Sequence, residues 1–143
     1  MFSTGKDDWE TPQDFYDNLN KEFRFTLDPC CTPDNAKCKK YYTPDDDGLI
    51  KDWQGETVFC NPPYSKKTKD KPGQEDWIKK CYEESQKPNT TVVMLLPART
   101  DTKAFHTYIY KKAEIRFIKG RLRFGGSNNS APFPSMVVVF KNE

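Results

Sequence analysis

The sequence contains few of the residues from which metal sites are built. Its five cysteines include no Cys-x2-Cys pair, and the chain has a single histidine, His106. A structural zinc site needs four such ligands at characteristic spacings, so we expect no bound metal. An odd number of cysteines without a secretion signal also favours reduced thiols over a disulfide framework.

The chain also lacks any long apolar run. No stretch approaches the roughly 20 apolar residues that a membrane-spanning helix needs, and the first residues do not have the pattern of a signal peptide. We therefore expect a soluble, cytoplasmic protein with no membrane partner. Its 143 residues suit a single compact domain spanning 1–143, with one modest core. The sequence does not indicate an oligomeric state.

The sequence also has no large excess of positive or negative charge. The chain carries 23 basic and 21 acidic side chains, a formal net charge of +2, which neither requires nor excludes nucleic acid. The basic residues are nevertheless clustered, in a loop with Lys66, Lys67, Lys69 and Lys71 and near the C-terminus with Arg116, Lys119, Arg121 and Arg123. Such clusters can hold phosphates, and a solvated lysine-rich loop is the alternative.

The most informative motif is Asn61-Pro62-Pro63-Tyr64, which follows the apolar run at 57–60. The prolines have no N–H and fix φ, so a strand cannot continue through them. The Asn61 carboxamide oxygen and the Pro62 carbonyl can each accept a hydrogen bond from an amino group, and the Tyr64 ring can stack on the attached base. A plain strand-ending turn is the alternative.

Hydrophobic periodicity predicts an α/β fold. Helices are expected to begin near Thr11-Pro12, with Thr11 as N-cap and Pro12 as first helical residue, and to span about 74–86 and about 101–112. Strands are expected at 24–27, 57–60, 91–96, 114–118, 121–124 and 135–140. Because strands alternate with helices, we expect a mainly parallel sheet, ended by an antiparallel hairpin of the last two strands.

Three of the predicted strands end at polar or proline-containing turns. These are Asp28-Pro29, Asn61-Pro62 and the segment 97–101. In an open parallel sheet such turns share one edge, where ligands bind. Arg99 in the third turn is a candidate either for a substrate contact or for capping the helix that follows.

Six motifs follow one another along the chain: WETP at 9–12, FTLDPC at 25–30, DDDGL at 45–49, NPPY at 61–64, LLPARTD at 95–101 and KGRLRF at 119–124. This series resembles the compact Dam-type DNA adenine methyltransferases of phages and prophages, from about Trp9 to Phe140. The tetrapeptide alone also fits protein-glutamine and rRNA methyltransferases. An enzyme acting on those substrates, or a non-catalytic nucleic-acid-binding protein of the same fold, is therefore the alternative.

The resemblance implies a Rossmann-like fold that uses S-adenosylmethionine to methylate the 6-amino group of adenine in DNA. The catalytic positions that it implies are Asn61, Pro62, Pro63 and Tyr64. The implied cofactor positions are Trp9, Thr11, Pro12, Asp28, Pro29, Cys30 and either Asp47 or Asp52. Contacts with nucleic acid would come from Lys66, Lys67, Lys69, Lys71, Arg99, Arg121 and Arg123.

One feature departs from many methyltransferases. They carry a glycine-rich turn after the first strand, where the backbone approaches the cofactor closely. Here the turn at 28–34 reads DPCCTPD and contains no glycine. Either the side chains of Cys30 and Thr32 are small enough to let the backbone approach the cofactor, or the cofactor is bound differently.

Overall fold

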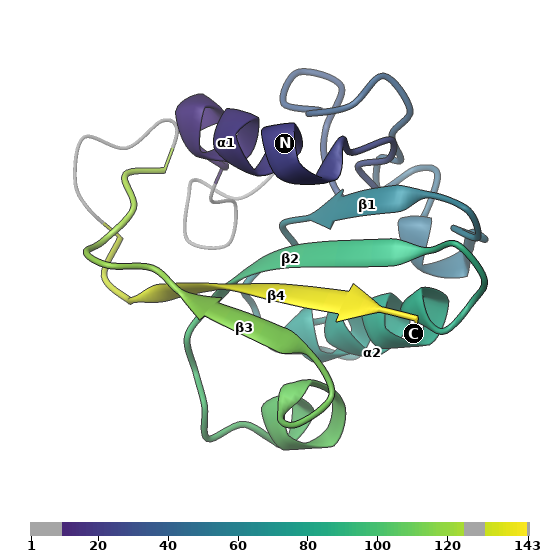
Figure 1. The fold of residues 1–143 in the computed structure, drawn as a ribbon. Coiled ribbons are helices and arrows are strands. Elements are labelled where there is room, and N and C mark those ends of the chain that lie inside the picture. Colours follow the sequence, from purple (N-terminus) through teal and green to yellow (C-terminus); the bar gives the residue numbers. More distant parts are fainter. Residues whose placement is uncertain (1–9, 125–130, 143) are drawn as a thin grey trace.

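The computed structural model describes residues 10–124 and 131–142. Figure 1 shows the order of the elements, which are α1 (Gln13–Phe23), a short 3-10 helix η1 (Gly48–Ile50), β1 (Thr57–Cys60), α2 (Gln74–Ser85), β2 (Thr91–Pro97), a π-helical turn η2 (Phe105–Ile109), β3 (Glu114–Phe117) and β4 (Ser135–Lys141). Among the described residues, no helix is both long enough and apolar enough to cross a bilayer.

The four strands form one sheet in the order β1-β2-β4-β3. β1 and β2 are parallel, whereas β4 is antiparallel to both β2 and β3. β1, β2 and β3 therefore run in one direction, and β4 alone is reversed. The α/β class is confirmed, but the expectation of a mainly parallel sheet is wrong. Two of the three strand pairs are antiparallel because β4 inserts between β2 and β3.

The C-terminal antiparallel pair uses a different strand from the one predicted. β4 pairs with β3, with Glu114 opposite Val139, and residues 121–124 do not form a strand. Gly120 has a φ of 77°, a conformation that side chains disfavour and that turns the chain after β3. Phe124 is buried on the face of the sheet that α1 covers, and its segment does not form a strand at the sheet edge.

Both faces of the sheet are covered, which explains the continuous apolar sequence of β2. Alternate residues of this strand point to opposite sides, so Val92 and Met94 pack with α2 and η2 while Val93 and Leu95 pack on the side of α1. Figure 1 shows α1 and α2 on opposite sides of the sheet.

The predicted helices are observed with changed ends. α2 agrees with the prediction to within one residue. α1 begins after Pro12, and no side chain caps it, so the assignment of Thr11 as N-cap is wrong. The third helix is reduced to the turn η2, before which the Thr102 hydroxyl accepts a hydrogen bond from the N–H of Phe105 at 3.1 Å.

The segment at 24–27 is not a regular strand. Leu27 forms a single parallel bridge with Val58, and Asp28 forms another with Tyr41. These bridges still fix the segment beside β1, because the N–H of Phe59 donates to the carbonyl of Leu27 at 3.0 Å. The Asp28-Pro29 turn and the Asn61-Pro62 turn are thereby brought to the same edge of the sheet.

Candidate functional site

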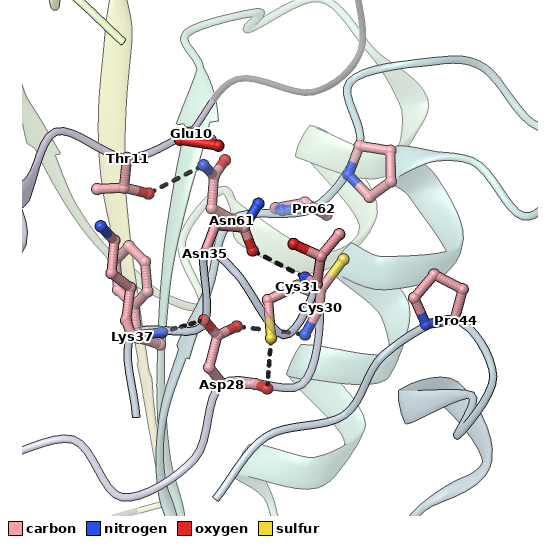
Figure 2. Close-up of a pocket in the computed structure, with 13 residues that line it drawn as sticks. Glu10, Thr11, Asp28, Cys30, Cys31, Asn35, Lys37, Pro44, Asn61 and Pro62 are labelled. Carbon is pink, nitrogen blue, oxygen red and sulfur yellow. Dashed lines mark hydrogen bonds between the residues drawn. The ribbon is translucent and has the colours of Figure 1, made fainter. Parts of the chain in front are cut away.

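A cavity of about 150 Å³ lies between these two turns (Figure 2). It is lined by Glu10, Thr11, Asp28, Cys30, Cys31, Thr32, Asn35, Lys37, Pro44, Phe59, Asn61, Pro62 and Pro63. These residues come from four stretches of the chain that are distant in sequence. The first two turns predicted to bind ligand, Asp28-Pro29 and Asn61-Pro62, therefore border one cavity. The third turn, 97–101, contributes no lining residue.

Asp28 is the buried acidic group of the cavity, with 3% of its surface exposed. Its carboxylate accepts hydrogen bonds from the backbone N–H of Cys30 at 3.3 Å and of Lys37 at 3.0 Å. Its backbone donates to the carbonyl of Lys40 at 3.1 Å and accepts from the N–H of Tyr42 at 2.9 Å. Burial raises the pKa of this carboxyl to about 6, although the two N–H donors oppose that rise.

A glycine from another part of the chain packs closely on this turn. A Cβ on Gly48 would lie 2.3 Å from the carbonyl oxygen of Pro29, a distance that real side chains do not adopt. The Asp28-Pro29 backbone thus packs directly on a residue without a side chain. This glycine was not identified from the sequence because it lies 19 positions after Pro29, in the Asp47-Gly48 pair.

The two aspartates proposed for the cofactor do not line the cavity. The Asp47 carboxylate accepts a hydrogen bond from the N–H of Leu49 at 3.2 Å and so caps η1. Asp52 is exposed, accepts from the N–H of Gln54 at 2.9 Å and forms an ion pair with Lys87.

The other implied cofactor positions are divided. Thr11 and Cys30 line the cavity, whereas Pro12 and Pro29 adjoin it in sequence without lining it. Trp9 lies outside the described residues.

Asn61 follows β1 directly and is half-buried. Its Nδ2 donates a hydrogen bond to Oγ1 of Thr11 at 2.9 Å, and Figure 2 shows the two side chains facing each other across the cavity rim. Thr11 is 5% exposed. Pro62 and Pro63 continue the lining, so three of the four predicted catalytic residues border the cavity.

Tyr64 takes a different position. Its ring is 7% exposed, and its hydroxyl donates to the carbonyl of Leu95 in β2 at 3.1 Å. The rings of Phe124 and Phe133 meet it at steep angles, with centroids 6.4 and 5.5 Å away. In this structure Tyr64 anchors the turn to the sheet, and its role as a stacking surface for a base stays a prediction.

The lysine-rich loop borders a second, open hollow. Lys66, Lys67, Lys69 and Lys71 are all exposed, and the last three line the hollow together with Lys79 and Lys80 of α2. Acidic side chains share it, because Asp76 forms an ion pair with Lys67 at 3.6 Å and Asp70 and Glu83 also line it. The loop is therefore only partly a cationic surface.

The candidate arginines are all exposed. The guanidinium of Arg99 lies 6.0 Å from the ring centroid of Phe133. Arg121 donates to the carbonyl of Ala131 at 3.3 Å. Arg123 is exposed beside the buried Phe124.

Several lining residues were not identified from the sequence: Glu10, Cys31, Asn35, Lys37, Pro44 and Phe59. The turn-forming sequence Thr-Pro-Asp-Asn at 32–35 could have indicated some of them. In the structure, the N–H of Thr32 donates to Oδ1 of Asn35 in this turn at 2.7 Å. All five cysteines are free thiols. Within the described ranges, no group of three or more His, Cys, Asp or Glu side chains could hold a metal ion.

Comparison with known proteins gives a consistent result. A sequence model of the family described as DNA N-6-adenine-methyltransferase (Dam) matches residues 2–142. A DNA N-6-adenine-methyltransferase of Haemophilus phage HP1 (strain HP1c1) is 32% identical over 144 residues, which cover 95% of this chain and 79% of the phage protein. A protein of the same name from Escherichia phage T1 is 31% identical over 120 residues, 82% of this chain but only 47% of the T1 protein.

Proposed function

The chain belongs to the DNA N-6-adenine-methyltransferase (Dam) family, and on that basis we propose that it transfers a methyl group from S-adenosylmethionine to the 6-amino group of adenine in DNA. One observation carries the assignment of residues. A single cavity is lined by Asp28, from the turn predicted to hold the cofactor, and by Asn61 and Pro62, predicted to bind the amine. Methyl donor and acceptor must meet in one cavity, because transfer needs close and aligned reactants.

The lining residues fit S-adenosylmethionine in their chemistry. The Asp28 carboxylate can accept hydrogen bonds from hydroxyl or ammonium groups, and the Phe59 ring offers an apolar surface. Gly48 packs directly on the carbonyl of Pro29 and so helps to fix the backbone of the Asp28-Pro29 turn. When bound, the cofactor supplies a methyl group activated by its sulfonium centre. We assign Asp28 and Cys30 to its side of the cavity, within a Rossmann-like arrangement of β1 and β2.

The amine side of the cavity supports a mechanism of positioning and electrostatics. The lone pair of an adenine amine is delocalised into the ring, so the amine is a poor nucleophile. Hydrogen bonds from its two N–H groups to the Asn61 carboxamide oxygen and the Pro62 carbonyl direct that lone pair out of the ring plane. Both acceptors are fixed before the reaction, so they also stabilise the positive charge that develops on nitrogen.

The DNA substrate imposes further requirements. The 6-amino group is enclosed in a duplex, so the adenine must be flipped out before it can enter the cavity. We assign Lys66, Lys67, Lys69, Lys71, Arg99, Arg121 and Arg123 to phosphate contacts, in keeping with their exposure. The phage relatives support, as part of this proposal, an activity in the cytoplasm of a bacterial host.

A direct test of these phosphate contacts is the salt dependence of DNA binding. Replacing Lys69 and Lys71 by glutamine should lower affinity for all DNA sequences and flatten the salt dependence by roughly one unit of slope for each phosphate that is no longer neutralised. Lys103→Gln serves as the matched control, because Lys103 is an exposed lysine that does not line this hollow and is not assigned to DNA. Equal slopes for wild type and the double variant would contradict the assignment.

The decisive experiment identifies the methylated product. Purified protein is incubated with labelled S-adenosylmethionine and unmethylated genomic DNA, and the DNA is digested to nucleosides. Label is expected in N6-methyl-2′-deoxyadenosine. The cofactor should also raise the melting temperature of the protein, because it binds the folded state. Label found only with RNA or protein substrates, or a chain that binds DNA without binding the cofactor, would support one of the alternatives instead.

A further inference from the structure

We infer that Thr11 is a positioning residue for Asn61, holding its carboxamide in the orientation needed to accept the substrate amine. The inference rests on the proposed function, since it concerns the same reaction. It changes the role of Thr11, which the sequence assigned to a helix cap and to the cofactor. The Oγ1 of Thr11 accepts a hydrogen bond from Nδ2 of Asn61 at 2.9 Å, although the two residues are 50 positions apart.

The backbone near Asn61 offers little to hold its side chain. Rotation about χ2 of asparagine is broad, so the plane of the carboxamide is set by its hydrogen-bond partners rather than by an intrinsic preference. The next two residues are prolines, which have no N–H to donate. The buried Thr11 hydroxyl, from a distant part of the chain, is a partner that sets this plane.

The packing of α1 fixes the distance between the two residues. Tyr16, in the first turns of α1, meets the ring of Phe59 edge-on with centroids 5.2 Å apart. Phe59 lies in β1, two residues before Asn61, so the helix and the strand end form one packed unit. Thr11 lies two residues before the first helical residue, Gln13, and its side chain does not cap the helix. Its hydroxyl is thus held rigidly at the nitrogen end of the carboxamide.

The experiment compares Thr11→Val, which keeps the shape but removes the hydroxyl, with Thr11→Ser, which keeps the hydroxyl. Single-turnover methyl transfer, cofactor affinity by calorimetry and melting temperature are measured for each. Thr11→Val should slow methyl transfer about 10- to 100-fold, the effect of a misplaced catalytic group, while cofactor affinity changes less than about twofold. Thr11→Ser should restore most of the rate.

A matched control separates positioning from general stability. Thr90 is 2% exposed, and its hydroxyl accepts from the N–H of Gly55 at 2.9 Å on a part of the chain that does not line the cavity. Thr90→Val removes a buried acceptor of the same kind, so it should lower the melting temperature without slowing methyl transfer. If Thr11→Val behaves like Thr90→Val, the role of Thr11 is structural and the inference is overturned.

The remaining outcomes are equally distinct. If Thr11→Val weakens cofactor binding and leaves the single-turnover rate at saturation unchanged, Thr11 is a cofactor ligand and the inference is overturned. If methyl transfer is fast in wild type and equally fast in Thr11→Val, the inference fails while the proposed function stands. If wild type itself transfers no methyl group to adenine, it is the proposed function that fails.

Discussion

The two turns that border the cavity are held in different ways. The Asp28-Pro29 turn is tied down by its backbone, which both donates to Lys40 and accepts from Tyr42, and by two backbone N–H groups that converge on the carboxylate. The turn at 61–64 contains two prolines and so has fewer backbone donors. Two of its side chains anchor it instead, Asn61 to Thr11 and Tyr64 to Leu95.

This difference indicates how the two halves of the site respond to substitution. A turn held by backbone hydrogen bonds keeps its geometry when most side chains change, so its properties depend on packing and on the charge of Asp28. A turn held by side chains can be loosened one side chain at a time. We therefore expect substitutions near Asp28 to change cofactor affinity, and substitutions at 61–64 to change turnover.

The largest expected effect comes from the side-chain-anchored turn. Asn61→Ala removes an acceptor that acts on the developing charge, and should lower the rate of methyl transfer about 10²- to 10³-fold. Cofactor affinity should stay close to wild type because no cofactor residue is removed, and the melting temperature should fall only slightly through the lost hydrogen bond to Thr11. Asn18→Ala, on the exposed side of α1, is the control. A folded Asn61→Ala protein with near-normal turnover would remove the catalytic assignment.

A pair of glycine substitutions sharpens the comparison at the level of packing. A Cβ on Gly48 would meet the carbonyl oxygen of Pro29 at 2.3 Å, and a Cβ on Gly73 would meet the backbone nitrogen of Lys67 at 2.1 Å. Each glycine thus packs on the backbone at or just after one of the two turns. Each alanine variant should lose about 1–3 kcal/mol of folding free energy, the usual cost of overpacking.

The two variants should differ in function. Gly48→Ala displaces the Asp28-Pro29 backbone and is expected to weaken cofactor binding, measured by calorimetry. Gly73→Ala displaces the start of the lysine-rich loop and is expected to weaken DNA binding while cofactor affinity is kept. Equal loss of cofactor affinity in both variants would mean that the two turns are not independent.

The sequence predicted the parts of the fold that depend on local pattern. The apolar run at 91–96, the strand at 57–60 stopped by prolines, and the amphipathic helix at 74–86 are all observed. The position of β4 between β2 and β3 depends instead on pairing between segments about 40 residues apart, which periodicity does not encode. For the same reason the sequence paired 121–124 with β4, whereas β3 is the actual partner.

The site was predictable to a similar extent. Strand-ending motifs identified Asp28 and Asn61, because parallel strand ends share an edge. They did not identify Gly48, whose importance lies in its close packing on Pro29 across the fold. They also did not separate Asp47, which caps a short helix through a local hydrogen bond, from a cofactor ligand. Whether an acidic side chain caps a helix or lines a cavity depends on where the side chain points, and the sequence alone does not determine this.

The pH dependence of cofactor binding tests the backbone-anchored turn. Burial raises the pKa of Asp28 to about 6 from its usual 3.8. If the ionised carboxylate holds the cofactor, affinity is full above pH 6 and falls by up to about tenfold for each pH unit below it. Asp28→Asn should flatten this profile, while Asp52→Asn, at an exposed carboxyl outside the cavity, should leave it unchanged. A wild-type profile that is flat between about pH 5 and 7 would show that Asp28 does not bind the cofactor as an anion.

The stability of the free protein should change in the opposite sense over the same range. Between pH 3.8 and about 6 the native carboxyl keeps a proton that the unfolded chain has already released. The contribution of Asp28 to the free energy of unfolding is therefore largest below pH 3.8 and decreases as the pH rises through about 6. The difference in melting temperature between wild type and Asp28→Asn, followed over this window, measures it.

The smallest expected effect concerns the hydroxyl of Tyr64, which ties the catalytic turn to β2. Tyr64→Phe keeps the ring against Phe124 and Phe133 but removes the donor to Leu95, and should cost about 0.5–1.5 kcal/mol of stability, read from denaturant unfolding. Tyr64→Ala also removes the buried ring and should cost about 3–5 kcal/mol. If the ring also stacks on the flipped adenine, Tyr64→Phe keeps normal turnover once folded, because the hydroxyl takes no part in stacking. A folded Tyr64→Phe protein with strongly reduced turnover would instead mean that the hydrogen bond to Leu95 sets the position of Asn61 and Pro62, and that the turn depends on each of its side-chain anchors.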